Sequence, residues 1–143
     1  MIAILREVHR PLFPAGRREL ALLVERLLVA LGLAGRDVAV TLTDDRGIAR
    51  LNRRFLGLPG PTNVLAFPDE EGFGLGEVAL CLDALLRESR LYGQDPAEHL
   101  LRLLAHALLH CAGLEHGPEM DHLAEAAVAA VSGEAFQPGL PAT

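Results

Sequence analysis

The chain has 143 residues, of which 50% are hydrophobic and 22% are charged, a balance typical of one globular domain with a sizeable core. Its apolar runs are shorter than the roughly 20 residues that cross a bilayer, and its first residues lack a signal-peptide pattern, so we expect a cytoplasmic protein with no membrane partner. A net charge of −6 argues against a surface that coats nucleic acid generally, and two cysteines are too few for a disulfide framework.

The first half of the chain predicts alternating strands and helices. An apolar run at residues 2–8 predicts a first strand. Leucine and valine recur at spacings of three and four over residues 17–31, which predicts a helix. Residues 37–43 alternate and carry β-branched side chains, as a second strand does. A capped helix is expected over residues 44–55, ended by the glycines and prolines that follow it.

The second half predicts two strands and three helices. The elements are strands at 61–68 and 76–82 and helices at 83–92, 96–112 and 118–131. The two strands flank an acidic, glycine-rich turn, so they form a hairpin or add an edge to a sheet. The helix at 96–112 is apolar nearly all round, so we expect it to be buried at the centre.

Together these elements predict a mixed α+β domain over residues 1–133. We expect about four strands in a mixed sheet, packed with about five helices. The prolines and glycine of residues 134–143 predict a disordered tail.

Three histidines on and after the central helix have the spacing of metal ligands. His106 and His110 are four residues apart, so on a helix they lie one turn apart on the same face. Gly113 permits the left-handed turn that brings His116 back as a third ligand. Three imidazoles leave one position open, which is typical of a catalytic zinc site.

Other residues near this motif have weaker claims to a role. Cys111 follows His110 directly, and because consecutive helix positions face different ways, it is not counted as a ligand. His122 is expected on the last helix, where a surface or capping role is favoured over metal binding. Glu115 is the nearest carboxylate to the motif, and either moves protons or orients a ligand histidine.

Three stretches of the chain resemble one protein family. They are HALLHCAGLEH at residues 106–116, PTNVLAFP at 61–68 and LGEVALC at 75–81. In this order and spacing they are similar to the YbeY-type endoribonucleases, the bacterial rRNA maturation factors. The resemblance implies one zinc ion per chain, bound by His106, His110 and His116. It also implies an α/β domain with a four-stranded sheet beside the metal helix.

The resemblance further implies a function and partners. The expected activity is cleavage of single-stranded RNA in 16S ribosomal RNA processing and in ribosome quality control. The expected partners are ribosomal RNA and the small ribosomal subunit, together with ribosomal proteins or an assembly GTPase.

Several positions depart from the family pattern. They are Leu56, Ala66, Glu77, Ala107 and the pair Leu114-Glu115, where the family usually has arginine, serine, aspartate, glycine and Tyr-Asp. The family arginine follows an aromatic residue, here Phe55. We hypothesise that Arg53 or Arg54 takes over part of its role in holding phosphate, and Arg54 is also a candidate catalytic residue.

Two alternatives to a nuclease remain open. The histidine spacing also occurs in metalloproteases of the metzincin type, but those need a glutamate directly after the first histidine, where this chain has Ala107. The second alternative is a non-catalytic ribosome-assembly factor with a structural zinc, which the departures at Leu56 and Ala66 favour.

Overall fold

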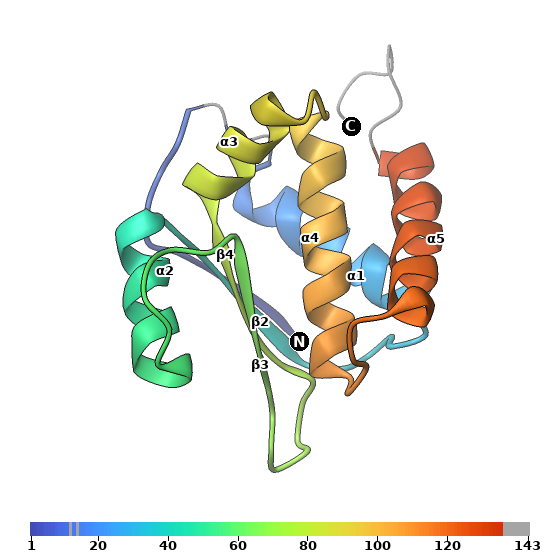
Figure 1. The fold of residues 1–143 in the computed structure, drawn as a ribbon. Coiled ribbons are helices and arrows are strands. Elements are labelled where there is room, and N and C mark those ends of the chain that lie inside the picture. Colours follow the sequence, from blue (N-terminus) through green and yellow to red (C-terminus); the bar gives the residue numbers. More distant parts are fainter. Residues whose placement is uncertain (12, 14, 136–143) are drawn as a thin grey trace.

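The computed structural model describes residues 1–11, 13 and 15–135, and it confirms the predicted fold class. Its strands are β1 (Ile2–Arg6), β2 (Val38–Thr43), β3 (Val64–Pro68) and β4 (Gly76–Cys81), and its helices are α1 (Arg17–Ala30), α2 (Asp45–Leu51), η1 (Asn52–Leu56), α3 (Leu82–Leu91), α4 (Pro96–Cys111) and α5 (Pro118–Ala135). Figure 1 shows α1, α4 and α5 on one side of the sheet and α2 on the other.

The sheet is mixed, with the strand order β1-β2-β4-β3. β1, β2 and β4 run parallel, and β3 pairs antiparallel with β4 as the edge strand. The side chains of β3 alternate between the two faces, as strand geometry requires. Leu65 and Phe67 join Ile48 of α2 on one face, whereas Val64 and Ala66 pack into the larger core beneath α4.

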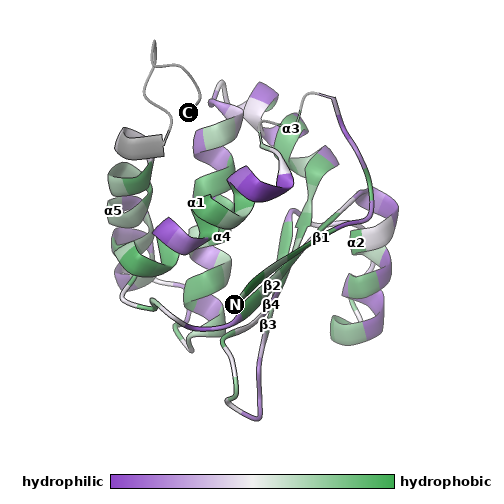
Figure 2. Ribbon diagram, turned by 180° about the vertical axis from the view of Figure 1, so that it is seen from behind, coloured by the Kyte–Doolittle hydropathy of each residue, from purple (hydrophilic) through white to green (hydrophobic). Residues whose placement is uncertain are grey.

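α4 is the buried central helix that the sequence predicts. Asp95 caps it by accepting a hydrogen bond from the Glu98 backbone N–H at 3.3 Å, and Pro96 occupies its first turn. Leucines on several sides of α4 are fully buried, because the helix contacts β3 and β4 as well as α1, α3 and α5. Figure 2 shows α4 and α5 largely in the hydrophobic colour. The histidines of α4 are therefore held on a rigid helix.

Several boundaries differ from those predicted; for example, β3 begins at Val64 and not at residue 61. β1 ends at Arg6 because the chain turns away toward α3, where Arg10 Nε donates to Asp83 at 2.7 Å. The helix expected over residues 44–55 splits into α2 and a π-helical turn, η1. α5 continues to Ala135, since an alanine-rich helix tolerates one glycine near its end.

Residues 136–143 lie outside the described residues, and the disordered tail stays a prediction. Within the described part of the chain, no helix has both the length and the apolar character to cross a membrane.

Candidate metal centre

The turn after α4 brings two of the three predicted ligands together. Gly113 has a φ of +99°, and its N–H donates to the His110 carbonyl oxygen at 3.0 Å, which ends the helix. The chain then returns, and the ring centroids of His110 and His116 lie 5.8 Å apart. Two imidazoles that share a tetrahedral zinc have centroids about 5 Å apart, so this pair is close to a binding arrangement.

The third predicted ligand, His106, lies one turn earlier and is partly buried, with 25% of its side chain exposed. Its Nδ1 lies 2.9 Å from the carbonyl oxygen of Arg102, and because a carbonyl only accepts, Nδ1 must donate. The neutral ring therefore carries its lone pair on Nε2. This backbone contact fixes the tautomer and the orientation of the His106 ring, as such contacts do for histidine ligands in known metal sites.

Nε2 of His106 faces Asp121 of α5, 3.3 Å from its Oδ1. An imidazole lone pair and a carboxylate repel each other unless a cation lies with them, either a proton on Nε2 or a metal ion. The end of α4 adds to this preference, since the C-terminus of a helix carries partial negative charge. The residues present therefore fit a bound cation.

In the described residues, the three histidines do not yet form a closed ligand set, because their ring nitrogens do not all lie within 4.8 Å of one another. The assignment of His106, His110 and His116 as ligands stays a prediction. Asp121 was missed by the sequence reasoning. It lies five residues beyond His116 and reads as an ordinary acidic residue in the first turn of a helix.

A different group of side chains, at the opposite end of the sheet, does have its possible ligand atoms within 4.8 Å of one another. Asp45, Cys81 and Asp83 converge there from α2, β4 and α3. Arg10 donates to Asp83, Arg87 donates to Asp45 at 3.1 and 3.2 Å, and the Cys81 thiol donates to Asp45 at 3.3 Å. The two arginines thus already occupy the place of a cation.

The electrostatics of this second group agree with a structural role. The hydrogen bond from Arg87 lowers the pKa of Asp45, and that from Arg10 lowers the pKa of Asp83. Burial raises the pKa of Cys81 to about 12, so its thiol stays protonated at neutral pH. We assign the cluster to holding α2, β4 and α3 together.

Among the contacts that the structure describes, none joins the remaining candidates near α4 to the histidine nitrogens. The Cys111 thiol donates to the carbonyl oxygen of Glu77 at 3.8 Å, facing the sheet, and burial raises its pKa to about 11. Glu115 and His122 are exposed. The proton-carrying or orienting role of Glu115 stays a prediction.

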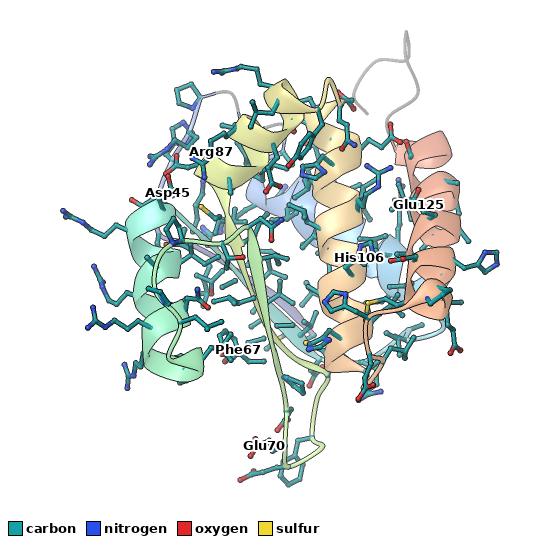
Figure 3. The ribbon with its side chains drawn as sticks, in the orientation of Figure 1. Asp45, Phe67, Glu70, Arg87, His106 and Glu125 are labelled. Carbon is teal, nitrogen blue, oxygen red and sulfur yellow. The ribbon has the colours of Figure 1, made fainter. Side chains whose placement is uncertain are left out.

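Arg53 and Arg54 lie on η1, across β3 from α4, and both are exposed. Figure 3 places Phe67 of β3 between the lower end of α2 and α4, so the arginines and the histidines flank the same edge strand. A substrate that reached both would cross β3. Arg53 and Arg54 therefore lie beside the candidate metal centre, and within the described contacts they do not touch its histidines.

Comparison with known proteins agrees with this architecture. A family profile described as Endoribonuclease YbeY matches residues 17–128. The chain is 42% identical to the Endoribonuclease YbeY of Oleidesulfovibrio alaskensis over 147 aligned residues, covering 86% of this chain and 87% of that protein. It is 41% identical to the Endoribonuclease YbeY of Nitratidesulfovibrio vulgaris, covering 80% and 83% of the two chains.

A solved structure extends the similarity to three dimensions. The solution structure of TM1509 from Thermotoga maritima superposes with a TM-score of 0.68 at 28% identity, covering 99% of this chain and 100% of that one. The metalloprotease alternative requires a glutamate at the position of the buried Ala107. The resemblance inferred from the sequence motifs is thus confirmed: the chain belongs to the YbeY endoribonuclease family.

Proposed function

We propose that this protein is a zinc-dependent endoribonuclease that cleaves single-stranded RNA during 16S ribosomal RNA maturation and ribosome quality control. Family membership supports the nuclease activity. The observation that carries the metal dependence is His106, whose Nε2 lone pair is held toward Asp121 one turn before the paired rings of His110 and His116. One zinc ion per chain fits this donor set.

The proposal includes partners and a compartment. The substrate is ribosomal RNA within the small ribosomal subunit, in the cytoplasm, and the further partners are ribosomal proteins or an assembly GTPase. These follow from the family and from the local basic surface on α2 and η1, in a chain whose net charge is −6.

Zinc bound by three histidines would supply a Lewis acid for the phosphodiester and a nucleophile at neutral pH. The residues of the chain do the rest. The Arg102 carbonyl oxygen holds the His106 ring in one orientation. Arg53 and Arg54 attract the phosphates of the strand, and Glu115, exposed beside His116 in the sequence, accepts or returns a proton.

Asp121 gives the non-catalytic alternative a specific observation of its own. A carboxylate 3.3 Å from His106 Nε2 is placed to become a fourth protein ligand, and four protein ligands are typical of structural zinc. On that alternative, the protein would bind the small subunit as an assembly factor and cleave nothing.

The test is cleavage of a 16S ribosomal RNA fragment by zinc-loaded protein, beside His110→Ala and His122→Ala. His122 is an exposed histidine on α5, so its variant controls for losing a histidine. We expect the wild type and His122→Ala to cleave, and a folded His110→Ala to be inactive. If no protein cleaves RNA while folded His110→Ala still binds the small subunit, the assembly-factor alternative replaces the nuclease.

The arginines are tested in the same assay. We expect Arg53→Ala or Arg54→Ala to reduce cleavage, because each removes a charge that attracts phosphate. If both variants cleave at the wild-type rate, the hypothesis that they replace the family arginine is wrong.

A further inference from the structure

The end of η1 exposes an unusual group of large apolar side chains. Phe55, Leu56 and Leu58 are 56%, 53% and 53% exposed. The Phe55 ring packs against Phe67, with centroids 5.2 Å apart and an interplanar angle of 59°. Most of a phenylalanine is expected to be buried in a small domain, so an aromatic ring left in solvent suggests a binding partner.

The charges around Phe55 point to the chemistry of that partner. The guanidinium of Arg54 lies 5.3 Å from the centre of the Phe55 ring. Three more arginines on α2 and η1, Arg46, Arg50 and Arg53, are exposed, and within the described residues none of the four forms an ion pair. An acidic protein thus gathers unpaired positive charge around one exposed aromatic ring, which suits an anionic partner with flat apolar groups.

The backbone holds this surface in place. Asn52 is buried, its side-chain Nδ2 donates to the Gly60 carbonyl oxygen at 3.1 Å, and its own carbonyl oxygen accepts from the Leu58 N–H at 3.3 Å. These bonds tie two points of the loop after η1, Leu58 and Gly60, to one buried residue. A π-helical turn is uncommon and is frequently found at functional sites. Phe55 is therefore presented by a fixed turn, which lowers the entropy lost on binding.

The exposed surface around Phe55 and the histidines of α4 lie on opposite sides of the same edge strand, β3. Phe67, against which Phe55 packs, is on the edge strand β3, and α4 packs on the opposite face of that strand. The free edge of β3 therefore lies between the Phe67 side of the strand and α4 (Figure 3). A strand of RNA held at Phe55 can cross this edge toward His110 and His116.

We propose that Phe55 is a positioning residue that stacks on an unpaired RNA base, while Arg54 and its neighbours neutralise the adjacent phosphates. This inference rests on the proposed function and gives it a source of selectivity. A base inside a duplex has both faces covered by its neighbours, whereas an unpaired base offers a face to an aromatic ring. Stacking at Phe55 therefore selects flexible single strands and sets which phosphodiester reaches the histidines.

The chain offers a direct spectroscopic test because it contains no tryptophan. The substitution Phe55→Trp places a single indole at the proposed stacking position. Phe73→Trp is the matched control, since Phe73 is 84% exposed but lies on the acidic hairpin between β3 and β4. Each zinc-loaded variant is mixed in a stopped-flow instrument with a short oligoadenylate, its abasic counterpart with the same number of phosphates, or an RNA duplex.

We expect the oligoadenylate to quench the indole emission of the Phe55→Trp variant strongly, and the abasic strand and the duplex to quench it little. The emission of the Phe73→Trp variant should be unaffected by all three. In fluorescence anisotropy, Phe55→Leu, which retains the apolar contact with Phe67, should bind a labelled oligoadenylate roughly 5- to 100-fold more weakly than the wild type. The abasic strand should bind both proteins equally.

Stacking is refuted if RNA binds while the emission of the Phe55→Trp variant is unchanged and Phe55→Leu retains wild-type affinity. That result leaves the proposed nuclease activity intact, since cleavage by the wild type is followed separately on a gel. Conversely, if the Phe55→Trp variant is quenched as expected but the wild type leaves RNA uncut, the stacking is supported and the nuclease proposal fails.

Discussion

Replacing Asp121 with asparagine tests whether the contact with His106 belongs to a metal site. The substitution keeps the size of the side chain and removes its charge. In the structure the carboxylate lies 3.3 Å from His106 Nε2 and is 68% exposed. If a divalent cation binds at Nε2, Asp121 stabilises it either as a ligand or as a neighbouring negative charge, and asparagine weakens that stabilisation.

The magnitude follows from Coulomb's law. A zinc ion lies about 2 Å from its imidazole nitrogen, so a carboxylate oxygen 3.3 Å from that nitrogen is at most roughly 5 Å from the ion. Because Asp121 is largely exposed, the dielectric constant of water applies, and the interaction at that greatest distance is about 1.7 kcal/mol. Screening at physiological ionic strength roughly halves this value. Asp121→Asn should therefore weaken zinc binding about 5- to 15-fold, and more if Asp121 is a direct ligand.

The assay is competition for zinc with a chromophoric chelator, at several salt concentrations. Glu119→Gln is the control, because Glu119 is an exposed acid in the same first turn of α5 that makes no described contact with His106. We expect the control to change the zinc affinity less than Asp121→Asn does, and the effect of Asp121→Asn to shrink at high salt. Equal zinc affinity in the wild type, Asp121→Asn and Glu119→Gln would refute a role for Asp121 at the metal.

Two further predictions concern stability. Arginine hydrogen bonds lower the pKa of Asp45, Asp83 and Glu125 in the folded protein, so their stabilisation is complete above the ordinary carboxyl pKa of about 4 and is lost as pH falls through the folded values. Urea unfolding at a series of pH values should show a falling free energy of unfolding below about pH 4, and a constant value there would contradict these pairings. Gly76→Ala should destabilise the protein by about 3 kcal/mol, against about 1 kcal/mol for Gly72→Ala. Both glycines have positive φ, but only at Gly76 would a Cβ meet backbone, 2.3 Å from the Phe67 carbonyl oxygen, so equal losses in thermal unfolding would count against the β3–β4 geometry.

Local patterns in the sequence were enough to predict the elements, because each is encoded by its own periodicity and caps. The leucines of α1 and α4 repeat at helical spacing, and Asp95 and Pro96 mark the start of α4. The strand order was beyond such patterns. β4 lies between β2 and β3 because of packing between distant segments, and nothing within β4 itself specifies that position.

The candidate metal site was likewise predictable only where its residues are close together in the sequence. His106, His110 and His116 are recognisable because their spacing lies within one helix and its turn. Asp121 became visible only when α5 packed against α4. Phe55 was expected along the same helix as Ile48, but the π-helical turn changes the spacing, and the ring is left 56% exposed.

The central claim, that the three histidines hold one zinc ion, is tested most directly by zinc content. The protein is purified as wild type, His110→Ala and Cys81→Ser, and the zinc per folded chain is measured by mass spectrometry. We predict about one zinc in the wild type and in Cys81→Ser, because Cys81 belongs to a cluster whose carboxylates are already paired with arginine, and much less in His110→Ala. Zinc that persists in His110→Ala and disappears in Cys81→Ser would place the metal at the Asp45, Cys81 and Asp83 cluster and contradict the account.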